Sequence, residues 1–259
     1  MFRKLGAGLV KATVLGSVLP YIALATLIFS WSRRYVGSVY ASVLAFLLAI
    51  TPPVWSLSRI HEPDCLSTLW ACLALYFIFE RGQLTIGSVF LLSSVYIRTD
   101  NVLLVFCVIA YLGLTKQIDR PKLAALAAVA LASVFIINHF AGDYGWRLLY
   151  YRGFIGPPLA PGEFVAHFTF ADYERALRRG INGLLNGNFV PFFLLGLIGF
   201  FASAKRVMGK AFAVVVVFSA AHFIIFPLTE DRYLAVYFVL AGLTAIAGLA
   251  AHNQNPLTR

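Results

Sequence analysis

The feature that most constrains this chain is a series of long apolar runs separated by short polar clusters. A run of about 20 apolar residues can cross the ~30 Å hydrocarbon core of a bilayer as a helix. A helix is suited to that setting because it satisfies its own backbone hydrogen bonds, for which lipid offers no partner. The chain is 60% hydrophobic and only 12% charged, against about 25% charged residues in soluble domains. The sequence therefore predicts an all-α fold, a polytopic transmembrane helical bundle.

We expect about eight to nine membrane segments and a single membrane domain over residues 1–259. The shorter segments between Cys65 and Leu114 would have to be tilted or extended by flanking residues. The candidate segments are Ala12–Trp31, Tyr35–Trp55, Cys65–Phe79, Leu84–Ile97, Val102–Leu114, Leu123–His139, Phe189–Ala204, Ala211–Leu228 and Tyr233–Ala251.

The basic residues predict which ends of these segments share a side, because cytoplasmic loops of membrane proteins collect Lys and Arg. This rule accounts for the formal net charge of +10 without a nucleic-acid partner, which we do not expect. Together with the apolar runs it predicts a multi-pass membrane protein, and the small size and short loops fit the bacterial cytoplasmic (inner) membrane. The clusters assigned to the inner side are Arg33 and Arg34; Lys116, Arg120 and Lys122; and Lys205, Arg206 and Lys210.

The one sizeable polar segment, residues 140–188, is predicted to be a loop on the outer face. Within it, Asp172–Arg179 is expected to form a short helix, which Thr169 or Asp172 would cap and Gly180 would end. An apolar face is given to it by Leu177, Ile181, Leu184 and Leu185. We therefore expect one amphipathic helix that lies in the membrane interface.

Polar residues that can take part in catalysis or ligand binding gather in three breaks between apolar runs: Ser58–Asp64, Arg98–Asn101 and Thr229–Tyr233. The predicted outer face holds nine of the 11 acidic residues, and only Glu80 and Asp119 fall inside. Arginine grips phosphate in two places and stays charged when partly buried. Carboxylates can take a proton from an attacking hydroxyl or hold a divalent metal. The plainer alternative is that these arginines and acids simply pair at helix ends.

These breaks supply every candidate site residue. We predict no metal site, because no histidine has metal-ligand spacing with another. The candidate catalytic residues are Glu62, Asp64 and Asp100, and the candidate substrate-binding residues are Arg59, His61, Arg98, Asn101, Asp231, Arg232 and Tyr233.

Three patterns in chain order give the sequence a resemblance to a known family: Thr51-Pro52-Pro53 leading to Ser58–Asp64, then Arg98-Thr99-Asp100-Asn101, then Asp231-Arg232-Tyr233-Leu234. With them the chain resembles the integral-membrane glycosyltransferases of the C fold. The resemblance implies a polyprenyl-phosphate-linked sugar as donor, membrane lipid as a partner, and transfer on the outer face. It also implies a catalytic carboxylate in the first external loop, in some members together with a divalent cation.

The sequence departs from that family at its start. No acidic residue precedes Glu62, and Arg3, Lys4 and Lys11 fall on the outer side, where basic residues are not expected. The family's first helix and its catalytic loop are therefore expected to be missing. We predict a membrane glycosyltransferase or part of one, and its status as an enzyme stays open. Two alternatives stay open as well: a transporter or lipid flippase, and a non-catalytic subunit that works with a partner membrane subunit.

Overall fold

The computed structural model of the chain describes residues 14–59, 64–98, 101–141, 169–186, 207–225, 235–236 and 239–244. All regular secondary structure in these ranges is helical, so the predicted all-α class is confirmed for them. In chain order the named helices are η2 (Val14–Val18), α2 (Leu19–Ser32), α3 (Ser38–Ala49), α4 (Pro52–Arg59), α5 (Asp64–Leu75), η3 (Tyr76–Glu80), α6 (Leu84–Ile97), α7 (Val102–Leu114), α8 (Arg120–Ala141), α9 (Phe170–Asn186) and α11 (Val207–Ile225).

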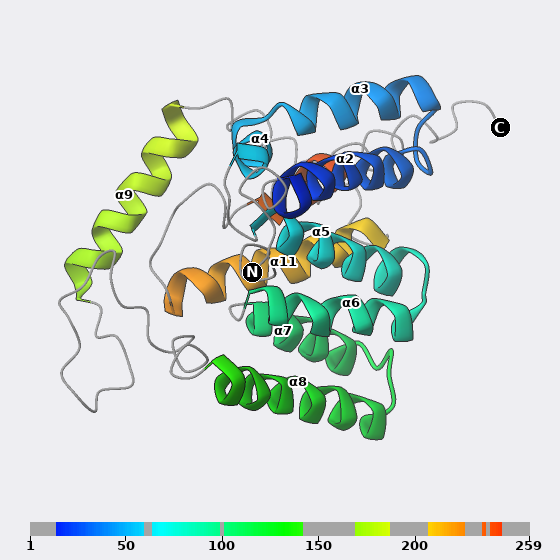
Figure 1. Ribbon diagram of the computed structural model, residues 1–259, viewed down its shortest axis with the longest axis vertical. Helices are drawn as coiled ribbons and strands as arrows, with labels where there is room; N and C mark the ends of the chain where they lie inside the picture. Colours follow the sequence, from blue (N-terminus) through cyan, green and yellow to red (C-terminus); the bar gives the residue numbers. More distant parts are fainter. Residues whose placement is uncertain are drawn as a thin grey trace.

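Most of the helices lie side by side and alternate in direction (Figure 1). Short connections force this arrangement, because a few residues can only turn the chain back along its neighbour. Thus α3 returns along α2, α6 returns along α5 and its π-helical extension η3, and α8 returns along α7. Helix α11 packs on α7 and runs opposite to it (Figure 1).

This alternation gives the bundle two ends, which we name after the acidic residue at each. At the Asp64 end, α5 and α7 begin and α6 ends. At the Glu80 end, η3 and α7 end and α6 begins. Asp64 and Glu80 stand at the two ends of one continuous helical segment, so about 24 Å of helix separates them.

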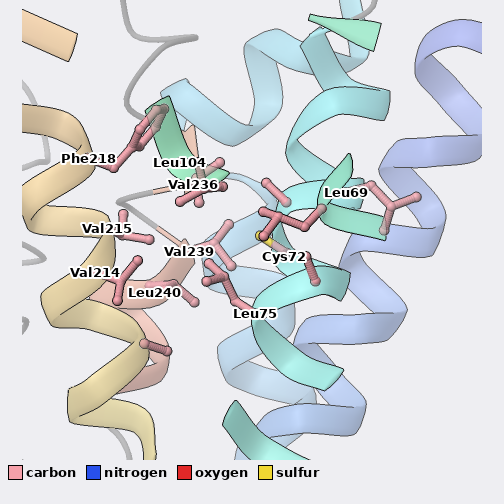
Figure 2. Packing of buried hydrophobic residues seen from close by; sticks show 14 of the residues in the cluster. Leu69, Cys72, Leu75, Leu104, Val214, Val215, Phe218, Val236, Val239 and Leu240 are labelled. Atoms are coloured by element: carbon pink, nitrogen blue, oxygen red, sulfur yellow. The ribbon is translucent and has the colours of Figure 1, made fainter. Parts of the chain in front are cut away.

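The core is built from aliphatic and aromatic side chains of segments far apart in the sequence (Figure 2). Leu75 of α5 and Leu240 of the helical residues 239–244 are both fully buried, and Val215 of α11 joins them. Trp31 and Phe212 are the largest fully buried side chains. The core therefore fastens α11 and residues 239–244 to the first half of the chain.

The described helices contradict the transmembrane prediction. Across the ranges the structure covers, none of them combines the length and the apolar character that crossing a membrane requires. Helices α3, α6 and α7 have 12, 14 and 13 residues and rise only about 18–21 Å. The predicted polytopic bundle with about eight to nine membrane segments is therefore wrong, and so is the predicted multi-pass location in a bacterial inner membrane.

The segment Tyr35–Trp55 shows the physical reason for this error. It was predicted as one span, but the helix within it covers only Ser38–Ala49. Gly37 caps the start of this helix with an extended backbone conformation. At the other end, Pro52 has no N–H group to continue the helical hydrogen bonds of α3. It starts α4 instead, so a single apolar run folds into two short helices.

Helix α9 confirms the predicted helix within residues 140–188 and corrects its extent. It covers Phe170–Asn186, so Gly180 does not end it. The backbone N–H and the hydroxyl of Thr169 donate to Asp172 Oδ2 at 2.8 and 2.7 Å. This is the half of a capping box in which the acidic side chain reaches back to the first residue. The transmembrane arrangement in which this helix was given its interfacial position is contradicted by the described helices.

Candidate functional site

The structure brings together two residues predicted for the site, Asp64 and Arg98, at the Asp64 end of the bundle. Asp64 is the first residue of α5, and Arg98 directly follows α6 with an extended backbone. Arg98 Nη1 donates a charge-assisted hydrogen bond to Asp64 Oδ1. The Asp64 side chain is 2% exposed and that of Arg98 20% exposed. The carboxylate is thus enclosed, whereas the guanidinium lies at the edge of the interior.

Asn101 joins this pair as a third predicted residue. Its backbone N–H donates to the carbonyl oxygen of Arg98 at 3.1 Å, which closes the tight connection between α6 and α7. Its side-chain Nδ2 donates to Ser67 Oγ at 2.7 Å and to the Ser94 carbonyl oxygen at 3.2 Å. Asn101 as a whole is only 6% exposed. It therefore ties α5 to α6 beneath the ion pair and fixes the backbone that carries Arg98.

The position of Asp64 at a helix start also has an electrostatic consequence. The unpaired N–H groups of a first helical turn favour a negative charge by about 0.3–1 kcal/mol. Arg98 supplies the larger compensation, because burying a carboxylate without a partner is costly. The start of α5 and the Arg98 guanidinium thus both stabilise the negative charge of Asp64.

The other predicted site residues are not placed. Arg59 is the last residue of α4, but the position of its side chain lies outside the description. The remaining ones fall outside the described residues, namely His61, Glu62, Asp100, Asp231, Arg232 and Tyr233. In the covered ranges, no group of three or more His, Cys, Asp or Glu residues could hold a metal ion.

Sequence reasoning missed a second polar cluster, which surrounds Glu80 at the opposite end. Glu80 Oε2 accepts hydrogen bonds from Trp31 Nε1 at 3.3 Å and from the Tyr35 hydroxyl. Its Oε1 lies 3.3 Å from Arg34 Nη1. Burial, with the hydrogen bond to Glu80, raises the pKa of Tyr35, which therefore stays a donor at neutral pH. The signal was present, since the basic clusters placed Glu80 and Arg34 on one side.

The two clusters differ in what they can do. The donors around Glu80 all converge on one carboxylate and fasten the end of α2 to η3, which is a structural task. At the Asp64 end, an arginine at the edge of the interior is positioned by a buried acid and a buried amide. Such a guanidinium can bind an anion in a planar, two-point fashion. The Asp64 end is therefore the better candidate for a ligand site.

The chain matches no protein-family model, no curated protein and no solved structure.

Proposed function

We propose that the chain acts on a polyprenyl-phosphate-linked sugar, binding its phosphate at Arg98 and supporting transfer of the sugar to an acceptor hydroxyl. The observation that carries this proposal is the buried Asp64–Arg98 pair, whose guanidinium lies at the edge of the interior. Arg98 and Asn101 belong to one of the three breaks on which the family resemblance rests. Their position beside Asp64 brings together residues from two of those breaks, and this supports the proposal.

The proposed division of labour follows from the burial of each group. Arg98 is the residue that would contact the phosphate, because a guanidinium can share its N–H groups between two anions. Asp64 and Asn101 are positioning residues, because they hold Arg98 and the backbone beside it. The phosphate would therefore meet a cation whose orientation is set before it binds, which lowers the entropy cost of binding.

The transfer step needs a carboxylate other than Asp64, since that group already pairs with Arg98. Glu62 precedes Asp64 by two residues, and Asp100 follows Arg98 by two. In the proposed reaction, one of these carboxylates takes the proton from the acceptor hydroxyl while the hydroxyl oxygen attacks the anomeric carbon of the donor sugar. The bond between that carbon and the phosphate oxygen breaks, and polyprenyl phosphate leaves with the electron pair.

The test is a transfer assay with purified full-length chain, a short-chain polyprenyl-phosphate mannose and a sugar acceptor, read by mass spectrometry. Arg98→Lys keeps the positive charge but loses the planar fork, so we expect donor affinity to fall about tenfold or more. Glu62→Gln or Asp100→Asn should abolish transfer without weakening donor binding. Transfer that survives in both of these variants refutes the proposal that Glu62 or Asp100 takes the proton from the acceptor.

Folding must be separated from binding in this test, because Arg98 also compensates a buried charge. The double variant Asp64→Asn/Arg98→Gln removes both charges together and provides the matched control. It should remain folded by circular dichroism and still fail to bind the donor. A double variant that binds the donor like the unmodified chain excludes Arg98 as the phosphate contact.

A second candidate function, that of a non-catalytic subunit, is favoured by one observation. The only candidate catalytic residue that the structure describes, Asp64, is 2% exposed and already paired. A subunit of this kind should co-purify stably with a larger transferase and show no transfer alone. Transfer by the isolated chain would exclude it.

A further inference from the structure

An apolar groove of about 330 Å³ runs between α7 and α11. Leu103, Cys107 and Leu114 are among its lining residues on α7. Ala213 and Ala221 lie across from them on α11, where their small side chains leave the space. The volume is at the lower end of the range for small-molecule sites.

The shape of the groove points to a single hydrocarbon chain. From Leu103 to Leu114 the helix rises about 16 Å. Dividing the volume by this length gives a cross-section of about 20 Å², which is narrow and suits one extended chain rather than a ring system. Among the described lining residues, the only polar groups are the Tyr111 hydroxyl and the Cys107 thiol. Leu114 at one end of the groove is 84% exposed, so this end opens to the surface.

Two lysines stand at this open end. Lys210 precedes Ala213, Val214 and Val217 by three, four and seven residues, which places it on the same face of α11 as the lining. Helix α11 runs opposite to α7 (Figure 1), so Lys210 and Leu114 lie at the same end of the groove. Lys116 follows Leu114 by two residues. Neither lysine forms an ion pair within the part of the chain that the structure covers.

Lys116 occupies a backbone position that normally favours glycine. Its φ of 52° is left-handed, and it closes α7 with bonds from Lys116 N to Gly113 O at 3.2 Å and from Gln117 N to Leu112 O at 3.0 Å. This is a Schellman motif, in which glycine usually takes the left-handed residue. A lysine here costs backbone energy that glycine would not. Such an outlier is a reason to look for a task of the side chain.

We propose that the α7–α11 groove binds a single-chain fatty carboxylate, with its hydrocarbon tail along the groove and its carboxylate at Lys210 and Lys116. The tail meets an apolar lining, and the anionic head meets two cations at the open end. Tyr111 lines the groove within one turn of Leu114 and can donate its hydroxyl to the head group, because burial raises its pKa and keeps it protonated. The carboxylate position lies at the Glu80 end, where α7 ends, whereas the phosphate position of the proposed transferase lies at the Asp64 end, where α7 begins.

The test uses dodecanoate as the probe and Cys107 as the reporter. Cys65 and Cys72 are fully buried, and burial raises the pKa of each thiol to about 12. Burial raises the pKa of Cys107 as well, but this thiol is partly exposed and lines the groove. Dodecanoate should bind the full-length chain in calorimetry and slow the reaction of Cys107 with a maleimide. Dodecanol has the same chain without the charge and should bind about tenfold more weakly. Failure to protect Cys107, or equal binding of dodecanol, overturns the proposal.

Variants separate the tail site from the head site. Ala213→Leu fills the groove and should abolish protection of Cys107, whereas Ala128→Leu, at an exposed alanine of α8, should not. Lys210→Gln should weaken binding about three- to fivefold, as loss of a partly exposed ion pair does. Lys122→Gln removes the same charge from a lysine already paired with Asp119 at 2.9 Å and should leave affinity unchanged. Equal effects of the two lysine changes would mean non-specific charge attraction and would overturn the proposed head site.

Lys116→Gly gives a test in which stability and affinity move in opposite directions. Glycine relieves the left-handed strain, so the melting temperature should rise. The loss of the cation should weaken dodecanoate binding about two- to threefold. A variant that is more stable and binds dodecanoate as well as the unmodified chain would remove Lys116 from the site.

Discussion

Replacing Arg98 and replacing Asp64 should lower the free energy of unfolding by different amounts, although each change breaks the same ion pair. Removing one partner of a buried ion pair typically costs about 3–5 kcal/mol, because it leaves an uncompensated charge. Arg98→Met leaves the Asp64 carboxylate, which is 2% exposed, and should fall in that range. Asp64→Asn leaves the Arg98 guanidinium, which is 20% exposed and closer to water. We therefore expect the Asp64 change to cost less, about 2–3 kcal/mol.

The double variant Asp64→Leu/Arg98→Met completes the comparison. Replacing a whole buried pair by apolar residues is often neutral or stabilising. Loss of the acidic group at the start of α5, however, lowers the free energy of unfolding by up to about 1 kcal/mol. The double variant should thus lie within about 1 kcal/mol of the unmodified chain. Urea unfolding followed by circular dichroism at the helical band measures all four proteins. Single changes that each cost under about 1 kcal/mol, the value for exposed pairs, would refute the enclosed geometry.

Three further results are expected elsewhere in the bundle. Gly87→Ala places a methyl carbon 2.4 Å from Ile78 Cγ1, so α6 must move from η3 at about 1–3 kcal/mol, and the melting temperature should fall. Tyr35→Phe removes a donor from the enclosed carboxylate of Glu80 and should cost about 1–3 kcal/mol in urea unfolding. Hydrogen bonds from Thr169 lower the pKa of Asp172, so this group stabilises α9 above its ordinary pKa. That contribution is lost as the pH falls below about 4, and Asp172→Asn should remove this pH dependence of amide exchange in α9.

The parts of the fold that the sequence could predict are those set by local signals. Helices α6 and α7 have the expected bounds, Leu84–Ile97 and Val102–Leu114. The charged break between them, which contains Arg98, stops one apolar run and starts the next. The same break allowed Arg98 and Asn101 to be assigned to one site. Local chemistry was sufficient here, because a tight connection leaves neighbouring residues little freedom to separate.

The length of the helices could not be predicted from hydropathy alone, because an apolar run does not show where its backbone turns. Pro52 ends the run that begins at Tyr35, and η3 extends the run Cys65–Phe79 by one residue to Glu80. That extension is π-helical, a form often found where a helix serves a particular contact. Here it ends at the carboxylate that Trp31 and Tyr35 bind. The charge pattern placed Glu80 and Arg34 on one side, but the hydrogen bonds from Trp31 and Tyr35 become visible only in the folded chain.

The groove between α7 and α11 depends on helix pairing that no single segment encodes. In the sequence, Lys210 marks the edge of an apolar run, and Ala213 is one of many small residues within it. In the folded chain, Ala213 and Ala221 line the groove opposite α7, and Lys210 lies on the same face of α11 at the open end of the groove. A lysine at the end of an apolar run can therefore either mark the loop where a helix ends or contact the head group of a bound ligand. Lys122 and Lys210 differ in this respect, since Lys122 already has Asp119 as its partner.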